Sequence, residues 1–310
     1  MAANSILNAK DALRDGLVGV TAAATRLSSV DGQAGRLVLA GYAVEDLAPQ
    51  ATFEEVAHLF LRGRLPDSAE LSRFGAELAE RRLLSHATYM ILGEAARRSL
   101  PVIDALIMAV PTLLLKHGAD PADDALALVA AIPGIVGAYW RVRNGEQPAP
   151  VRQDLPHAAH FLHQVFGVEP AAESVRALET YLNTVCDHGL NASTFAARVI
   201  ISTQSDMVSA ATGAIGALKG PLHGGAPGPA LDMVLEIGEP ARAESLIRAR
   251  LACGERLMGF GHRVYKVRDP RADVLAAAVE RFFAVAGDRN LYELAREVEA
   301  IALRVVVSVL

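Results

Sequence analysis

Two helix-start signals in close succession near the N-terminus most constrain what this chain can fold into. Thr52 with Glu55 forms a capping box before an apolar run, and Asp67 with Glu70 opens the next run. Gly63 lies between the two signals, where a glycine commonly ends a helix. This spacing predicts helical hairpins. Similar punctuation recurs along the chain, so we expect helices to dominate the fold.

The composition supports the same conclusion. Hydrophobic residues make up 52% of the 310 residues and aromatic residues only 5%, a balance that favours helices over strands. Only the segment Arg36–Tyr42 indicates a strand or a small hairpin. The predicted fold class is therefore all-α, in a chain long enough for one large domain or two smaller ones.

Charge, cysteine content and hydropathy exclude several partners. The formal net charge of -5, with mixed signs, leaves no basic face for nucleic acid. Cys186 and Cys253 are too few for a disulfide framework and lack CxxC spacing, and the N-terminus lacks a secretory signal, so we expect a cytoplasmic protein. The longest apolar stretch, Ala125–Trp140, is short for a membrane span and is interrupted by Pro133-Gly134. We expect a buried helix there and no membrane partner.

Two glycine-rich segments each contain one histidine. The first, Gly220-Pro221-Leu222-His223-Gly224-Gly225-Ala226, lies between two helical runs, so we expect His223 at a helix start. Exposed backbone N–H groups there disfavour a positive charge and keep the imidazole neutral. A neutral imidazole can donate a hydrogen bond to a carbonyl oxygen and stabilise an enol or enolate.

The second segment, Gly259–Lys266, contains His262 and is followed by further cationic residues. Basic side chains cluster here and suit carboxylates and phosphates: Arg263, Lys266, Arg268 and Arg271. Together, the two segments indicate carbonyl chemistry on an anionic substrate.

Helix ends place two further candidates. The apolar spacing of residues 175–185 predicts a helix that Gly189 ends directly after His188. Asp269-Pro270 is typical of an N-cap and first helical residue, and Ser205 is the predicted cap of a helix that stops before Gly220. His188 then lies at a helix C-terminus, and the second glycine-rich segment joins two helices.

The run His157, His160 and His163 has the spacing of one helix face. No carboxylate lies beside it, so we expect no metal site there. Phosphate-binding loops, dinucleotide-binding glycine patterns and nucleophile elbows are not found in the sequence.

The ordered set of motifs resembles the citrate synthase family. The signature pair is GPLHGGA at 220–226 and MGFGHRVYK-x-x-DPRA at 258–272, and the resemblance extends to segments 187–195, 154–159 and, weakly, 31–37. It covers nearly the whole chain. It implies an all-α fold with a large helical domain over residues 1–225, a smaller helical domain over residues 226–310, and an active site in the cleft between them.

The resemblance also implies a reaction, in which the methyl carbon of an acyl-CoA condenses with the ketone of oxaloacetate and hydrolysis releases CoA. His223 would stabilise the enol of the thioester, and His262 would donate to the oxaloacetate carbonyl. His188 and Arg271 would bind oxaloacetate carboxylates. The alternatives from the residues alone are terminal helix carbonyls for His188 and an ion pair with Asp269 for Arg271.

For CoA, the resemblance implies a loop against the adenine and cations near the phosphates. The loop residues are Leu257, Met258, Gly259, Phe260 and Gly261, and the cations are Arg263 and Lys266, the latter with solvated surface charge as its alternative. Acetyl-CoA or propionyl-CoA would be a co-substrate, with no permanently bound cofactor. A homodimer is expected.

One departure from the family pattern concerns the C-terminus. The family carries an Asn-Val-Asp-Phe-Tyr-type segment whose aspartate removes the methyl proton, and this chain reaches Leu310 before such a segment. We therefore expect a family member shortened at its C-terminus, without the return to the large domain. Citrate and 2-methylcitrate both stay open as products. The rival hypotheses are a non-catalytic homologue that binds oxaloacetate or CoA, and a related citryl-CoA lyase.

Overall fold

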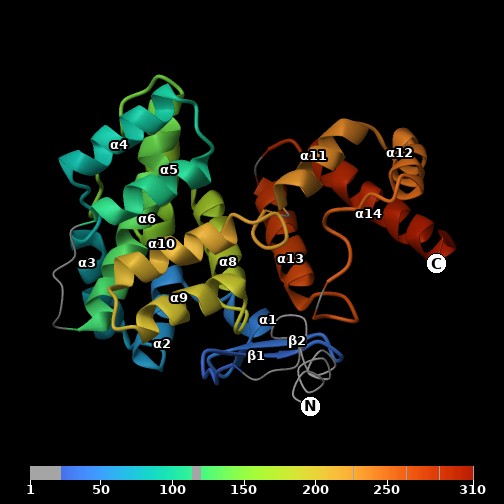
Figure 1. The fold of residues 1–310 in the computed structure, drawn as a ribbon. Coiled ribbons are helices and arrows are strands. Elements are labelled where there is room, and N and C mark those ends of the chain that lie inside the picture. The colour runs from blue at the N-terminus through green and yellow to red at the C-terminus, as the bar shows by residue number, and fades with distance from the viewer. Residues whose placement is uncertain (1–21, 114–119, 226, 263, 286, 310) are drawn as a thin grey trace, which may run out of the picture.

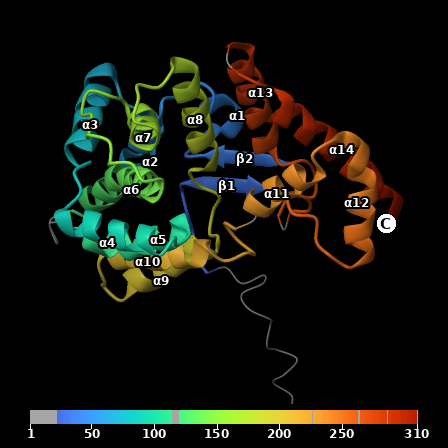
Figure 2. The ribbon, with the colours of Figure 1, turned by 90° about the horizontal axis from the view of Figure 1, so that it is seen from above.

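The computed structural model describes residues 22–113, 120–225, 227–262, 264–285 and 287–309, and within these ranges helices dominate (Figure 1). The predicted all-α class is confirmed. The helices gather into two lobes, with α13 between them (Figures 1 and 2). In chain order the first lobe contains α1 (Val44–Leu47), α2 (Phe53–Arg62), α3 (Ser68–Glu80), α4 (His86–Arg97), α5 (Val102–Ala109), a 3-10 turn η2 (Val110–Thr112), α6 (Pro121–Arg143), α7 (His157–Phe166), α8 (Ala172–Val185), α9 (Ala192–Ser202) and α10 (Met207–Leu218). The remaining helices are α11 (Pro227–Ile237), α12 (Pro240–Ala252), α13 (Pro270–Val285) and α14 (Asn290–Val309).

The predicted capping boxes form. In α2 the Thr52 side chain accepts from the backbone of Glu55, whose carboxylate accepts from the backbone of Thr52 at 2.7 Å. Asp67 and Glu70 form the same arrangement at α3, and Gly63 ends α2 with a φ of 82°. The prediction of Ser205 as a cap was wrong, because Asp206 accepts from the backbone N–H of Ser209 at 2.7 Å at the start of α10. A carboxylate also complements the positive end of the helix dipole.

A small antiparallel sheet near the N-terminus confirms the predicted hairpin. It has the order β1 (Ser28–Asp31), β2 (Arg36–Leu39) and β3 (Tyr42–Ala43), with Asp31 opposite Arg36. The buried side chains of Leu37 and Leu39 pack in one core cluster with residues of α1 and α2. Val274 of α13 joins the same cluster, so α13 is attached to the first lobe.

The apolar helix α6 is the centre of the first lobe. It passes uninterrupted through Pro133 and Gly134, and α3, α4, α5, α7 and α10 all pack against it. By length and composition it is the one helix in the described ranges that could cross a membrane, and half of its apolar window is buried in the protein. Gly137 lets α7 approach, because a Cβ there would lie 2.5 Å from Gln164 Cβ. We interpret α6 as a core helix.

The second lobe has its own core. Buried side chains of α11, α12 and α14 meet there, together with Leu257 from the loop after α12: Met233, Ile237, Ala243, Ile247, Val298, Ala302 and Val305. Figure 2 shows α13 beside α8 and α1, which it contacts. The second lobe is thus tied to the first through α13, and the domain boundary near residue 226 stays a prediction.

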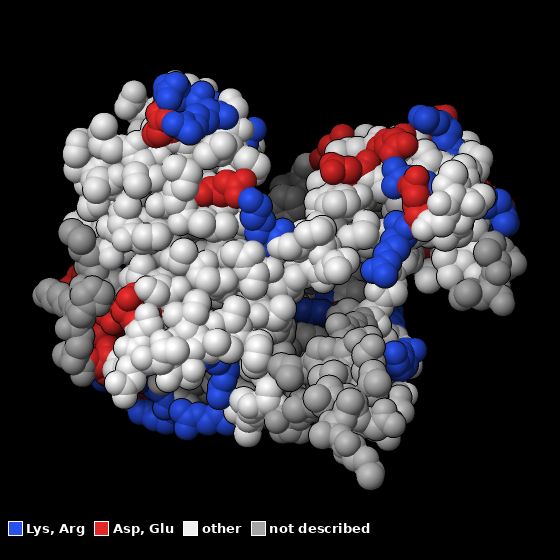
Figure 3. All heavy atoms as spheres, viewed as in Figure 1, with Lys and Arg blue, Asp and Glu red and all other residues white. Residues whose placement is uncertain are grey.

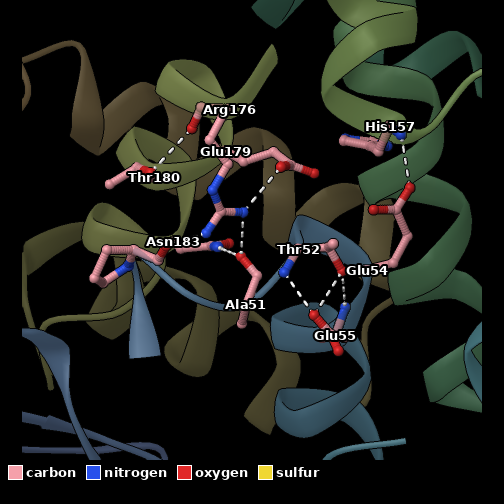
Figure 4. Close-up of polar contacts among 10 residues, drawn as sticks. Ala51, Thr52, Glu54, Glu55, His157, Arg176, Glu179, Thr180 and Asn183 are labelled. Carbon is pink, nitrogen blue, oxygen red and sulfur yellow. Dashed lines mark hydrogen bonds and ion pairs between the residues drawn. The ribbon is translucent and has the colours of Figure 1, made fainter. Parts of the chain in front are cut away.

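A buried polar cluster joins the start of α2 to α7 and α8 (Figure 4). The Glu54 carboxylate accepts from the backbone N–H of His157 at 2.7 Å. The carbonyl of Ala51 accepts from both Arg176 at 3.0 Å and Asn183 at 2.8 Å. These bonds satisfy backbone groups at helix ends that would otherwise be buried without partners.

The three histidines of the HxxHxxH run are all buried in α7. The ring of His157 stacks on Phe53 with centroids 4.1 Å apart, and His163 Nε2 lies 3.1 Å from the carbonyl oxygen of Pro150. Burial, reinforced by the Arg82 charge, lowers the pKa of His157 to about 3 and that of His160 to about 4. Among the described residues no group of three or more histidine, cysteine or acidic side chains is arranged to hold a metal.

These histidines should make the protein sensitive to mild acid. Their folded-state pKa values lie below the ordinary value of 6.5, so the unfolded chain binds protons that the folded chain does not. The stability that these two histidines contribute should be fully present above about pH 6.5. The free energy of unfolding should then fall as the pH drops toward 4, by up to roughly 1.4 kcal/mol per pH unit for each histidine. Urea unfolding across this range should show a shallower loss for His160→Leu. The control His86→Leu, at an exposed histidine, should leave the slope of unfolding free energy against pH unchanged. Equal slopes for the two variants would show that His160 does not cause the acid sensitivity.

Candidate active site

His188, His262 and Tyr265 lie together where the loop after α8 meets the loop between α12 and α13. The His188 and His262 ring centroids are 5.7 Å apart, and the Tyr265 ring lies 4.8 Å from His262 and 5.5 Å from His188. His188 Nε2 is 3.1 Å from the Tyr265 hydroxyl. The structure therefore brings together two histidines that were singled out from separate motifs.

The backbone determines the tautomer of His262. Its Nδ1 accepts from the N–H groups of Val264 and Tyr265, each at 3.0 Å. Because a backbone N–H can only donate, the neutral ring carries its proton on Nε2. Partial desolvation lowers the pKa of His262, and the ring is still exposed to solvent. His262 thus presents a neutral N–H donor that a ligand can reach.

His188 is also kept neutral. Desolvation, followed by the positive charge of Arg271, lowers its pKa. Burial raises the pKa of Tyr265 to about 12, so this hydroxyl keeps its proton. The three side chains form an uncharged group beside a single ion pair.

That ion pair joins Arg271 to Asp269. Arg271 Nη2 lies 2.7 Å from one carboxylate oxygen of Asp269, and both groups are about one quarter exposed, at 22% and 24%. Asp269 also accepts from the backbone N–H of Arg271 at 3.0 Å and so caps α13, as predicted. The local ion pair is therefore formed, and binding of a ligand carboxylate by Arg271 stays a prediction.

His223 lies between two helices, as the sequence predicts, and its ring contacts a third helix. It lies in the turn before α11, and its Nε2 accepts from the backbone N–H of Ser193, in the first turn of α9, at 3.3 Å. Ser193 Oγ lies 2.9 Å from the same nitrogen. Since the backbone N–H can only donate, the neutral ring carries its proton on Nδ1. Among the described residues no hydrogen bond or ring contact joins His223 to the His188 group.

The predicted CoA loop splits into buried and accessible residues. Leu257 is 6% exposed, and it and Phe260 pack on the core of the second lobe, while Met258 is half-buried. Gly259 and Gly261 have positive φ values of 89° and 75°, and a Cβ at Gly259 would lie 3.3 Å from Ala230 Cβ. Lys266 is exposed, and Arg263 lies outside the described residues.

Comparison with known proteins identifies the family. The family model "Citrate synthase, C-terminal domain" matches residues 16–309. The chain belongs to the citrate synthase family.

Individual relatives agree with this assignment. A 2-methylcitrate synthase of Mycobacterium tuberculosis is 41% identical over 277 residues, which cover 87% of this chain and 70% of the relative. The crystal structure of citrate synthase from Pyrobaculum aerophilum superposes with a TM-score of 0.84 at 38% identity, over 93% of this chain and 75% of that one. A Thermoplasma acidophilum citrate synthase, in a ternary complex with carboxymethyl coenzyme A and oxaloacetate, gives a TM-score of 0.83 at 32% identity. The match covers 92% of this chain and 77% of that one.

Sequence reasoning missed the glycines that hold the His262 loop of this citrate synthase family member. The backbone N–H of Lys266 donates to the carbonyl of Gly32, in the β1–β2 turn, at 2.8 Å. A Cβ at Gly32 would lie 2.2 Å from the carbonyl oxygen of Val264, and one at Gly35 would lie 2.7 Å from Val267 Cγ2. The weak family-like match at 31–37 was the available signal. Tyr265 and Ser193 were missed too, although both lie inside quoted motifs.

Gly32→Ala should displace the His262 loop. The added methyl would collide with a backbone oxygen, which cannot rotate away, so we expect a loss of about 1–3 kcal/mol of stability. Hydrogen exchange measured by mass spectrometry should show faster exchange at the amides of Val264, Tyr265 and Lys266. Gly75→Ala is the matched control, because a Cβ at Gly75 in α3 meets open space. Unchanged exchange in Gly32→Ala would show that the turn does not hold the loop.

Proposed function

We propose that this protein condenses acetyl-CoA or propionyl-CoA with oxaloacetate and releases citrate or 2-methylcitrate and CoA. The observation that carries the proposal is the pair of histidines His223 and His262, each with one ring nitrogen held by backbone N–H groups and the other left as a donor. Donors of fixed direction are what stabilise a developing oxyanion, because they need no reorganisation during the reaction. Membership of the citrate synthase family supports this reaction.

His262 would act on the ketone. Its Nε2–H donates to the oxaloacetate carbonyl oxygen and draws electron density from the carbon that is attacked. His188 and Arg271 would bind the carboxylates, and for this Arg271 must exchange part of its contact with Asp269 for the ligand. The planar guanidinium suits both partners, since each is a carboxylate.

His223 would act on the thioester. Its Nδ1–H donates to the thioester oxygen when a base removes a proton from the carbon next to the thioester carbonyl, and so stabilises the enol. That carbon is the methyl of acetyl-CoA or the methylene of propionyl-CoA. The enol carbon attacks the ketone carbon, the new carbon–carbon bond forms, and water then cleaves the thioester to release the CoA thiol. We do not assign the proton-removing base to Asp269, because its oxygens bind Arg271 and cap α13.

The CoA part of the acyl donor would lie along the loop after α12. Leu257 is directed into the core, so its backbone, with Met258 and the two glycines, would face the adenine. Lys266 and Arg263 would lie near the phosphates. Relatives that bear the names citrate synthase and 2-methylcitrate synthase support both acyl donors. The acyl-CoA is a co-substrate, and no permanently bound cofactor is proposed.

The test is release of CoA thiol by the 310-residue chain with oxaloacetate and either acyl-CoA. Oxaloacetate-dependent release is expected, and His223→Ala or His262→Ala should lower kcat by about a hundred to a thousand times. His86→Ala, at an exposed histidine in α4, should keep full activity.

Other outcomes overturn the proposal and separate its rivals. Folded chain that binds oxaloacetate by calorimetry but releases no thiol would indicate a non-catalytic homologue. Product formation only in the direction of citryl-CoA cleavage would indicate a lyase. Full activity in His223→Ala would exclude a role for this histidine in stabilising the enol.

A homodimer through α9 and α10 belongs to the same proposal. No residue of α9 is buried, and Figure 3 shows few charged side chains over the face that these two helices form. Large apolar side chains of the two helices are partly exposed: Phe195, Val199, Ile201 and Leu218. Such a face is costly in water, so we propose that a second copy covers it.

Val199→Glu should weaken this dimer. The side chain is 48% exposed in the single chain, so the substitution should be tolerated there, and a buried charge should oppose association. Light scattering should show a change from dimer to monomer, with the helical circular dichroism retained. Val168→Glu, at a 64% exposed site after α7, is the control and should remain dimeric. A monomeric unsubstituted chain would contradict the proposal.

We also propose a cytoplasmic location. Cys186 and Cys253 are both free thiols, and thiols stay reduced in that compartment. Fractionation of cells that express the chain with its own N-terminus would test this.

A further inference from the structure

Tyr265 is the buried residue of the His262 loop that contacts His188 of the first lobe. Only 3% of it is exposed, although its neighbours Val264 and Lys266 are exposed. Its ring lies against both His188 and His262. A tyrosine that is almost fully buried in an otherwise exposed loop needs a partner for its hydroxyl, because an unpaired buried hydroxyl destabilises the fold.

The hydroxyl proton of Tyr265 has one hydrogen-bond acceptor in the part of the chain that the structure describes. Among the described residues, the polar contact of Tyr265 Oη is with His188 Nε2, at 3.1 Å. If His188 Nε2 carried a proton, the tyrosine proton would have no acceptor there. The tyrosine therefore donates, His188 Nε2 accepts, and the neutral His188 ring carries its proton on Nδ1.

The backbone of the same residue acts on the other histidine. The N–H of Tyr265 donates to His262 Nδ1 at 3.0 Å and so places the His262 proton on Nε2. The next N–H, of Lys266, donates to Gly32 and holds this stretch of backbone against the β1–β2 turn. One residue thus contacts both rings. It determines which nitrogen of His188 carries the proton and, together with the N–H of Val264, which nitrogen of His262 does.

We propose that Tyr265 is a positioning residue that holds His188 as its Nδ1–H tautomer beside His262, so that each ring offers one N–H to an anionic oxygen. The effect on catalysis rests on the proposed condensation, whereas the tautomer does not. Without the hydroxyl, His188 is free to rotate or to move its proton to Nε2. The donor for the oxaloacetate carboxylate is then present for only part of the time.

The direct test is nitrogen-15 NMR of histidine-labelled protein, which distinguishes Nδ1–H from Nε2–H rings. His188→Gln identifies the His188 signals by their absence. The unsubstituted chain should show His188 as Nδ1–H, and Tyr265→Phe should convert it to a mixture or to Nε2–H. His262 should stay Nε2–H in both, because its backbone donors are unchanged. Tyr181→Phe, at a 48% exposed tyrosine in α8, is the matched control.

Kinetics supply the second readout. Loss of one oriented hydrogen bond should raise the KM for oxaloacetate about tenfold in Tyr265→Phe, with a smaller change in kcat and no change in the KM for acyl-CoA. A variant damaged only in its fold would instead show a lower kcat without a selective rise in the KM for oxaloacetate. Its Tm would also be lowered.

The outcomes separate the two proposals. His188 as Nε2–H in the unsubstituted chain overturns the assignment even if Tyr265→Phe does not fold. His188 kept as Nδ1–H in a folded Tyr265→Phe overturns the role of the hydroxyl. An unsubstituted chain without turnover refutes the condensation, while the NMR result still decides the role of Tyr265.

Discussion

The site depends on the contact between the β1–β2 turn and the loop between α12 and α13. The Lys266 N–H bonds to Gly32, and the absence of a side chain at Gly32 lets the carbonyl of Val264 approach. This contact holds the loop whose N–H groups orient His262 and whose tyrosine contacts His188. A hairpin from the start of the chain thereby positions residues more than two hundred places later.

Neutrality is the common electrostatic property of the site. Desolvation lowers the pKa of both His188 and His262, and the Arg271 charge is balanced by Asp269. Neutral rings with one nitrogen occupied by a donor keep a single N–H free, which is the form needed to stabilise an oxyanion. The same principle applies to His223, whose occupied nitrogen faces the first turn of α9. Backbone donors thus fix the tautomers of His223 and His262, and desolvation lowers the pKa of His188 and His262.

Local signals in the sequence predicted local structure well. The capping boxes at Thr52 and Asp67, the hairpin near 36–42 and the start of α13 at Pro270 all depend on residues a few positions apart, and all were confirmed. Ser205 was wrong because its neighbour Asp206 offers the stronger acceptor. The position of His223 before α11 follows from the chain order, whereas the contact of its ring with α9 does not.

The sequence by itself determined the helical class, most helix ends and, through its ordered motifs, the histidines and arginine that we propose for the site. These follow from hydrophobic periodicity and capping, which act over short distances. Only the tertiary structure decided that His188 and His262 share Tyr265, that Arg271 pairs with Asp269, and that Gly32 holds the His262 loop. Contacts of this kind join segments far apart in the chain, and tautomers depend on which donor arrives there. Residue order alone does not contain that geometry.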